Sequence, residues 1–384
     1  MIAYNREWLD ALLTKEAAER WRKKGLLSAE KWESVQAQFH TGFYSPNVFV
    51  RIGLAIFCMV LLLAMLGLVA WAVEPDTETG FALFSIFWGG VWLLALEFIL
   101  IRQHKHFGSG LDDMLLYAGT MAVVGGLGNL LPGMSEPLAW CFLALPFLVA
   151  GSIRYLDRLM AAAAFFCALW IVLLIVKEVP SLAIYLLPFS GMLFSGVAYF
   201  FAQKGQQTNT QRHWHGVFAM VELLALVAFY ASGNYSVVQQ TGADWFSMEQ
   251  VPLSWFFWAF TFAVPGLYIW QGLRSKDRLA LDVGLGCAVA AVLTFRYYFH
   301  VLPLAWVSVA GGAVLFVVSY FSIRYLRNNF AAYTYEEDEK DSLLQKAQEQ
   351  IFDQTIAGQA VSPSPQKDRM GGGQFGGGGA SGDF

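Results

Sequence analysis

The feature that most constrains this chain is a regular alternation of long apolar segments and short connectors. Every second connector is basic. Ten apolar segments lie between residues 48 and 323. A helix needs about 20 apolar residues to cross a hydrocarbon core of about 30 Å, and most of these segments approach that length. Because a chain in lipid must satisfy its backbone hydrogen bonds internally, such segments fold as helices. The pattern therefore predicts an all-α membrane protein with about ten transmembrane helices.

We expect these spans near residues 48–73, 80–101, 113–131, 137–153, 159–176, 182–202, 214–231, 252–271, 279–295 and 302–323. The composition agrees with this prediction. Hydrophobic residues make up 57% of the chain and charged residues only 14%, whereas soluble domains carry roughly 25% charged residues.

The basic residues predict an orientation for the spans. They gather before the first span and after every second span, for example at Arg102, Arg154 and Lys204. The connectors on the opposite side hold only Lys177 and Arg296, and the longest of them, 232–251, has neither Lys nor Arg. Since basic loops stay in the cytoplasm, both termini are expected to be cytoplasmic. An even number of spans agrees with this, because it puts both termini on the same side.

Three spans that run toward the basic side open on Pro-Leu-Ala-Trp or Pro-Leu-Ser-Trp. Proline fits the first helical turn, and a tryptophan one turn later suits headgroup depth. We therefore interpret Trp140, Trp255 and Trp306 as interface anchors. A related pattern, Arg-x-x-Asp-Arg-Leu at 154–159 and 274–279, indicates either a weak repeat four spans long or the same anchoring need at two places.

The chain divides into four regions. We expect a cytoplasmic helical hairpin at 1–46, the ten-helix transmembrane domain at 47–327, an acidic and partly helical segment at 328–361, and a disordered glycine-rich tail at 362–384. Ser28 stands where the second hairpin helix would be N-capped. The hairpin and the tail are candidates for binding a protein partner, and membrane lipids are the expected partners of the spans.

Two short patterns resemble known families. The segment Trp-Arg-Lys-Lys-Gly-Leu-Leu-Ser-Ala-Glu at 21–30, followed by a second helix and a first span, resembles the start of the bacterial membrane family named domain of unknown function 2157. The glycine-rich third span at 119–128 is similar in character. Arg296, Tyr297 and Tyr298 resemble a related family, domain of unknown function 4401. These resemblances imply a bacterial inner-membrane protein and carry over no activity.

Three acidic residues fall inside expected spans near the basic side: Glu97, Glu222 and Asp282. Ionisable groups in a membrane are energetically costly and commonly functional. We hypothesise that they line a polar cavity or an ion-binding site, with Glu222 as the deepest. The alternative is that each reaches the interface or pairs with the basic connectors.

Arg296 lies on the poorly basic side, followed by Tyr297 and His300. Its planar guanidinium is suited to a carboxylate or phosphate. We treat these three residues as a candidate contact for an anion or a lipid headgroup. Simple hydrogen bonding to outer headgroups is the alternative.

The sequence lacks the common catalytic patterns. It has no phosphate-binding Gly-x-x-x-x-Gly-Lys-Ser/Thr loop, no His-Glu-x-x-His and no Gly-x-Ser-x-Gly. The four cysteines lie in separate apolar segments, and the two His-x-His pairs lack a third ligand. We therefore expect no catalytic residues, no metal, no cofactor and no nucleic-acid partner.

The leading hypothesis is a multi-pass inner-membrane protein that transports or binds a small molecule within its helix bundle. The alternative is a membrane scaffold or regulator that binds partners through the hairpin and the tail. A lipid-modifying enzyme at the outer face ranks lowest, because no nucleophile or paired carboxylates stand there.

Overall fold

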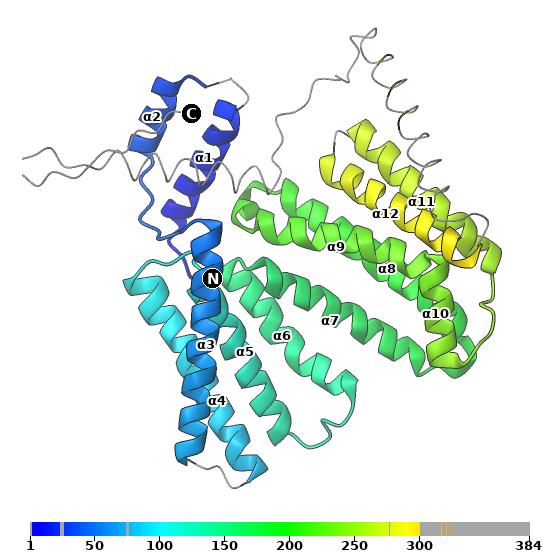
Figure 1. Cartoon of the computed structure of the whole chain (residues 1–384), viewed down its shortest axis with the longest axis horizontal. Coiled ribbons are helices and arrows are strands. Elements are labelled where there is room, and N and C mark those ends of the chain that lie inside the picture. Colours follow the sequence, from blue (N-terminus) through cyan, green and yellow to red (C-terminus); the bar gives the residue numbers. More distant parts are fainter. Residues whose placement is uncertain are drawn as a thin grey trace, which may run out of the picture. The chain divides into compact units, whose positions relative to one another are not determined.

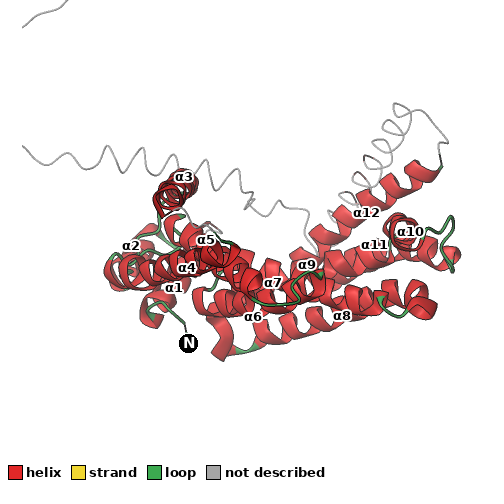
Figure 2. Cartoon of the chain, turned by 90° about the horizontal axis from the view of Figure 1, so that it is seen from below, coloured by secondary structure: helices red, strands yellow, loops and turns green. Residues whose placement is uncertain are grey.

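The computed structural model describes residues 2–23, 27–73, 77–275 and 277–299, together with Phe316, Tyr320 and Arg324. Every regular element in these residues is helical (Figure 2). The described part contains no strand, apart from an isolated bridge between Tyr44 and His106. The prediction of an all-α fold is confirmed.

The helices follow one another with short connections (Figure 1). Their bounds are α1 Arg6–Lys23, α2 Ala29–Gln38, α3 Val48–Val73, α4 Glu78–Leu94, α5 Leu111–Leu130, α6 Pro137–Tyr155, α7 Arg158–Lys177, α8 Pro180–Gln207, α9 His215–Gly233, α10 Tyr235–Phe246, α11 Ser254–Ser275 and α12 Arg278–Tyr298. A π-helical segment, η1 (Ala95–Gln103), continues α4, and a 3-10 helix, η2 (Asn209–Trp214), joins α8 to α9.

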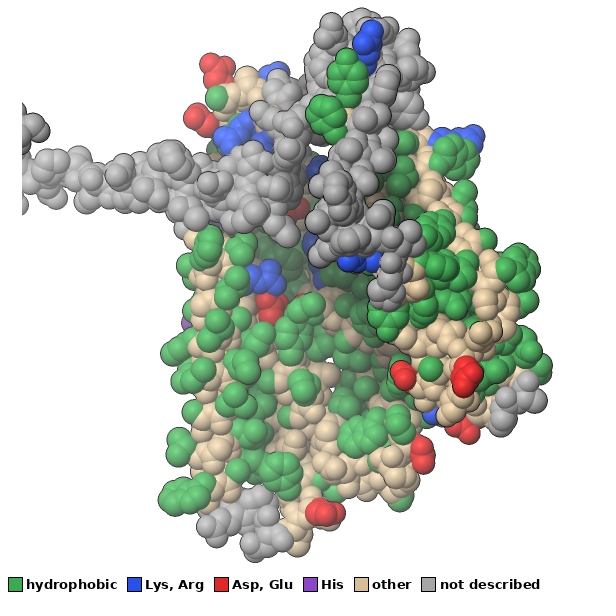
Figure 3. Space-filling view, turned by 45° about the vertical axis from the view of Figure 1, so that its right-hand side comes forward, with side chains coloured by type: hydrophobic (Ala, Val, Ile, Leu, Met, Phe, Trp, Pro, Cys, Tyr) green, Lys and Arg blue, Asp and Glu red, His purple; other side chains and the backbone are tan. Residues whose placement is uncertain are grey.

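Seven helical segments of the described chain are long and apolar enough to cross a membrane. They are Val48–Trp71, Glu78–Gln103, Pro137–Tyr155, Arg158–Lys177, Leu182–Gln207, Arg212–Gly233 and Arg278–Tyr298. Hydrophobic side chains cover most of the visible helical surface in Figure 3, which is the surface that lipid favours. These observations define a multi-pass membrane-type fold.

Two more of the ten expected spans correspond to the helices α5 and α11, which are not among these seven segments. Packing explains the difference for α5, because this helix contacts α3, α4 and α6. Gly119 and Gly126 of α5 are buried against α4, and Gly128 is buried against Trp140 of α6. Small residues at such contacts let helices approach closely. The tenth expected span, 302–323, lies outside the described residues except for Phe316 and Tyr320.

The repeated Arg-x-x-Asp-Arg-Leu pattern forms the same local structure twice. Asp157 caps α7 by accepting a hydrogen bond from the backbone N–H of Met160 at 2.7 Å. Asp277 caps α12 by accepting from the N–H of Leu279 at 3.0 Å. In both cases the preceding helix packs on the helix that the aspartate begins. The pattern thus encodes a tight turn between neighbouring helices, since an N-cap aspartate satisfies otherwise unpaired donors.

The hairpin helices α1 and α2 contact each other, and the Ser28 hydroxyl caps α2 as expected by accepting from Lys31 N–H. The segment before α1 packs on the first connectors of the bundle, where the Tyr4 ring meets Phe107 edge-on at 4.9 Å. Burial there, reinforced by nearby carboxylates, raises the pKa of Tyr4. On α1 itself, the Asp10 carboxylate pairs with Arg212 in η2 at 2.6 Å. The N-terminal segment therefore joins connectors that lie far apart in the sequence.

The connector 232–251, expected on the poorly basic side, contains a helix, α10, that we did not predict from the sequence. Asn234 begins this helix, because its Oδ1 accepts a hydrogen bond from Ser236 N–H at 3.0 Å. Its Nδ2 donates to the hydroxyls of Tyr230 at 2.9 Å and Thr294 at 3.2 Å. One buried amide therefore ties α9, α10 and α12 together.

Candidate functional site

Glu97 lies in η1, and its side chain is only 12% exposed. The carboxylate accepts hydrogen bonds from Arg154 Nη2 at 2.7 Å and from the Tyr155 hydroxyl at 3.3 Å. Arg102 stands 3.5 Å from the same carboxylate. Two guanidinium groups thus compensate the charge of Glu97, an arrangement that stabilises the contact between η1 and the end of α6.

Glu222 is buried in α9. Its carboxylate accepts hydrogen bonds from the side-chain amides of Gln206 and Gln203, both in α8. The Gln203 amide also donates to the Tyr199 hydroxyl at 2.6 Å. No Lys or Arg of the described chain pairs with Glu222, so neutral amides provide its polar environment.

Asp282 differs from the other two acids, because its side chain is 66% exposed and stands 3.9 Å from Arg278 one turn earlier. Within the described residues, no hydrogen bond or ion pair joins any two of Glu97, Glu222 and Asp282. Each acid has its own set of partners, and a polar cavity shared by all three stays a prediction from the sequence.

Arg296 lies near the end of α12, and its Nη1 is buried without a hydrogen-bond partner among the described residues. Tyr297 is exposed, while His300 and Trp306 lie outside the described residues. Among the expected anchors, Trp140 donates its indole N–H to the Met134 carbonyl at 2.7 Å. Trp255 is 73% exposed at the start of α11. The anion-contact and anchor roles of these residues stay predictions.

A second charged group lies where α3 meets α5. The Asp113 carboxylate accepts hydrogen bonds from Arg51 Nη2 at 2.6 Å and Nε at 3.0 Å. The neighbouring Asp112 is buried and accepts from the backbone N–H of Ser109 at 2.8 Å. Burial lowers the pKa of His106, whose Nδ1 lies 2.7 Å from the Ser109 hydroxyl. The charges of this connector are therefore also paired or capped.

Among the described residues, a partly enclosed space of ligand size lies elsewhere, among α7, α8, α9 and α10. This cavity has a volume of about 310 Å³, within the lower range of small-molecule sites. Its lining residues, which come from these four helices and the turn after α10, are Phe166, Leu169, Trp170, Leu173, Ile184, Leu187, Pro188, Leu224, Val227, Ala228, Ala231, Ser232, Val237, Val238, Thr241, Gly242, Trp245, Phe246 and Val251. We call it the α7–α10 cavity.

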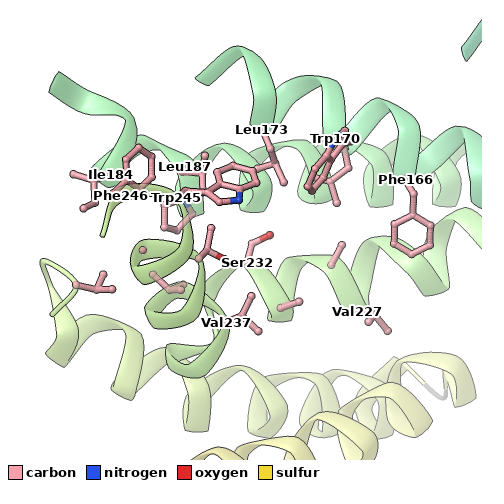
Figure 4. A pocket seen from close by; sticks show the side chains of 18 of the residues that line it. Phe166, Trp170, Leu173, Ile184, Leu187, Val227, Ser232, Val237, Trp245 and Phe246 are labelled. Atoms are coloured by element: carbon pink, nitrogen blue, oxygen red, sulfur yellow. The ribbon is translucent and has the colours of Figure 1, made fainter. Parts of the chain in front are cut away.

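The α7–α10 cavity has a buried floor and an aromatic rim. Leu187, Ala228 and Val238 form part of the floor and are almost fully buried. Phe166 and Trp170 are exposed at the rim, and the indole rings of Trp170 and Trp245 meet edge to face at 5.6 Å. Figure 4 shows the rings of Phe166, Trp170 and Trp245 together with Leu187 of the floor. A floor of aliphatic groups with an aromatic rim is typical of sites for hydrophobic ligands.

Three of the residues that line the α7–α10 cavity have polar groups: Ser232 and Thr241 each have a hydroxyl, and Trp245 has an indole N–H. None of them has a hydrogen-bond partner in the part of the chain that the structure describes. Figure 4 shows the Ser232 oxygen amid the labelled lining residues. All three groups can donate a hydrogen bond, so the cavity offers donors to an acceptor on a ligand.

The α7–α10 cavity was not predicted from the sequence, although the sequence contains a signal for it. Val238, Thr241, Gly242 and Trp245 recur at steps of three and four residues in the connector 232–251, which is the spacing of one helix face. Asn234 just before them is a favoured N-cap residue. The two signals together predict a short helix with one side turned to the bundle.

Comparison of the chain with protein-family models, with curated proteins and with solved structures finds no match. The class of the protein therefore follows from its structure alone. The chain is an all-α protein whose long apolar helices mark it as a multi-pass membrane protein.

Proposed function

We propose that this protein binds a small hydrophobic molecule in the α7–α10 cavity. The observation that carries the proposal is a partly enclosed, aliphatic space with an aromatic rim and three unpaired donors. Apolar side chains around a void lose contacts that a ligand would restore. The unpaired donors would orient the ligand, because an acceptor atom on the ligand could form hydrogen bonds with them that the protein does not form.

The contrast with the charged residues supports binding at this cavity rather than at the acids. The carboxylates of Glu97 and Asp113 already have guanidinium partners, so a ligand there would have to displace strong interactions. In the α7–α10 cavity, by comparison, no protein hydrogen bond of the described residues must break. Binding in the bundle therefore needs no rearrangement of ion pairs.

Saturable photolabelling tests the proposal. The probe is a long-chain alcohol that carries a diazirine, added to the full-length protein in lipid nanodiscs, with an unlabelled alcohol of the same length as competitor. We expect labelled peptides from α7, α9 and α10, and we expect the competitor to remove that labelling. Labelling that is spread over the lipid-facing surface and does not saturate would contradict the proposal, because it reports bulk lipid contact.

A matched pair of substitutions locates the labelling. Ala228→Phe places a ring in the floor of the α7–α10 cavity, and we expect saturable labelling to disappear. Ala150→Phe adds the same ring at an exposed position of α6, and labelling should remain as in the wild type. Thermal unfolding of both variants checks that each is folded. Equal labelling of the two variants would place the ligand elsewhere.

We also propose that the basic connectors face the cytoplasm of a bacterial cell. The support is the positive-inside rule applied to helices that are long enough to span a bilayer. A tag inserted at Gln240 in α10 should then be reachable only from outside the cell membrane. A tag reachable only from the cytoplasm would invert the orientation.

The scaffold hypothesis has its own support in α2, which has no buried residue. The guanidinium of Arg22 in α1 lies over the Trp32 ring of α2, 5.0 Å from its centroid. This is the one cation–π contact of Trp32 in the described chain. Such an open helix face suits a protein partner. Ala37→Cys should react more slowly with a maleimide in native membranes than in the purified protein if a partner covers α2. Equal rates would remove this alternative.

A further inference from the structure

The rim of the α7–α10 cavity carries one positive charge. Phe166, Trp170 and Leu173 line the cavity from α7, and Lys177 follows them by one helical turn on the same face. The Lys177 Nζ lies 5.1 Å from the centroid of the Trp245 ring, which itself lines the cavity. The ammonium group therefore stands beside the rim, held over an indole face by a cation–π contact.

Lys177 has no acidic partner within ion-pair distance in the described residues, unlike Arg51 in α3 and Arg154 in α6. It is also one of only two basic residues on the poorly basic side of the spans. Glu178 follows Lys177 and Asp244 precedes Trp245, and in the described chain neither carboxylate forms an ion pair with the Lys177 ammonium. A cation without an ion-pair partner next to an apolar cavity attracts an anion that is attached to an apolar chain.

The polar groups inside the cavity agree with this charge. Ser232 and Thr241 each offer a hydroxyl and Trp245 an N–H, and no carboxylate lines the cavity. These groups can donate to a ligand oxygen, whereas a cationic ligand would meet no acceptor charge.

We infer that the α7–α10 cavity takes an amphiphile with a single acyl chain and an anionic head, a carboxylate or a phosphate. The chain occupies the space above Leu187, Ala228 and Val238. The head lies at the rim, beside the Lys177 ammonium and within reach of the Trp245 edge. This inference rests on the proposed function, because it names the class of molecule that the same cavity binds.

Competition against the diazirine alcohol tests the head-group charge in the full-length protein in nanodiscs of neutral lipid. The competitors have one chain length and differ only in the head: carboxylate, monophosphate, alcohol and trimethylammonium. We expect the two anions to compete about fivefold better than the alcohol, the gain that one partly exposed ion pair provides. The ammonium compound should compete least. The carboxylate and phosphate arms distinguish a fatty acid from a phosphate-bearing lipid.

Two substitutions assign the effect. In Lys177→Gln, the anions should compete with the photolabel no better than the alcohol. Lys204→Gln is the same change at an exposed position near the opposite end of α8, and in this variant the anions should still compete better than the alcohol. If anion and alcohol compete equally in the wild type, or if Lys177→Gln has no more effect than Lys204→Gln, the inference is wrong and hydrophobic binding stands. If no competitor removes the labelling, the proposed function itself fails.

Discussion

The ion pairs at the helix ends and the α7–α10 cavity treat polar groups in opposite ways. At the helix ends, the carboxylates of Glu97 and Asp113 have guanidinium partners at 2.6–2.7 Å. In the cavity, Ser232, Thr241 and Trp245 have donors without a protein partner in the described chain. A satisfied buried charge stabilises packing, whereas an unsatisfied donor beside an empty apolar space is available to a ligand.

This difference shows why charge inside a span is an ambiguous sign of function. Desolvating a carboxylate is costly, so a folded protein supplies compensation wherever it can. The residues that attract attention in the sequence are therefore those that the fold has the strongest reason to pair. The following substitutions test how far the two regions differ, beginning with the largest expected effect.

The charged connector depends on a close approach at Gly110. This residue has φ of +90°, and a Cβ there would lie 2.2 Å from the backbone oxygen of Arg51. Gly110→Ala should therefore cost about 3 kcal/mol of unfolding free energy, because strain and backbone overlap add. Gly133→Ala has a similar φ of +82° but open space around it, and should cost only about 1 kcal/mol. Equal costs in chemical denaturation would mean that α3 does not approach as described.

Glu97→Gln should be destabilising by about 2 kcal/mol, since it leaves Arg154 and Arg102 facing a neutral amide. Asp282→Asn removes a carboxylate that is mostly exposed and distant from its partner, and the change should be close to zero. Thermal unfolding in one detergent measures both variants. If Asp282→Asn is as costly as Glu97→Gln, the assignment of Glu97 as a structural ion pair is contradicted.

The same substitution at two threonines compares satisfied with unsatisfied hydroxyls. The buried Thr261 hydroxyl accepts from Tyr235 N–H at 3.0 Å and donates to the Phe257 carbonyl at 2.7 Å. Thr261→Val should cost about 1.5 kcal/mol, because it leaves the Tyr235 N–H unpaired. Thr241→Val in the cavity should change stability by less than about 0.5 kcal/mol. A large loss at Thr241 would show that its hydroxyl already has a partner.

The smallest effect is a pH dependence at His106. Burial lowers the pKa of this imidazole below its usual value of about 6.5, so the folded protein binds fewer protons than the unfolded chain. Above about pH 6.5 the titration of His106 does not change the free energy of unfolding. As the pH falls through about 6.5 toward the lower folded pKa, it decreases the free energy of unfolding. His106→Gln should therefore lose less stability than the wild type between about pH 7 and about pH 5.5. Identical pH profiles would contradict this.

Much of the fold could be predicted from the sequence. The lengths of the apolar segments predicted the helices. Residues that favour the first turn of a helix predicted where two helices begin, with Ser28 as the N-cap of α2 and Pro137 at the start of α6. These features depend on residues within a few positions of one another, so they can be read directly. The helix α10 escaped prediction because it is short and its polar residues, such as Gln239 and Gln240, resemble those of a loop.

The candidate site was much harder to predict, because its parts come together only in three dimensions. Trp170, Ser232 and Trp245 lie on three different helices, and each alone resembles ordinary membrane packing. The pairing of Glu97 with Arg154 is equally remote in sequence. Charge and periodicity show that such residues exist, but packing decides whether they meet each other or leave a space.

The most direct test of the account is an anomalous diffraction map of the protein crystallised with a bromine-terminated long-chain alcohol. Bromine scatters anomalously, so its peak locates the end of the chain without interpretation of weak lipid density. The account predicts one strong peak in the α7–α10 cavity, near Ala228 and Leu187, and its loss in Ala228→Phe. A peak beside Glu97 or Glu222, with the cavity empty, would contradict it.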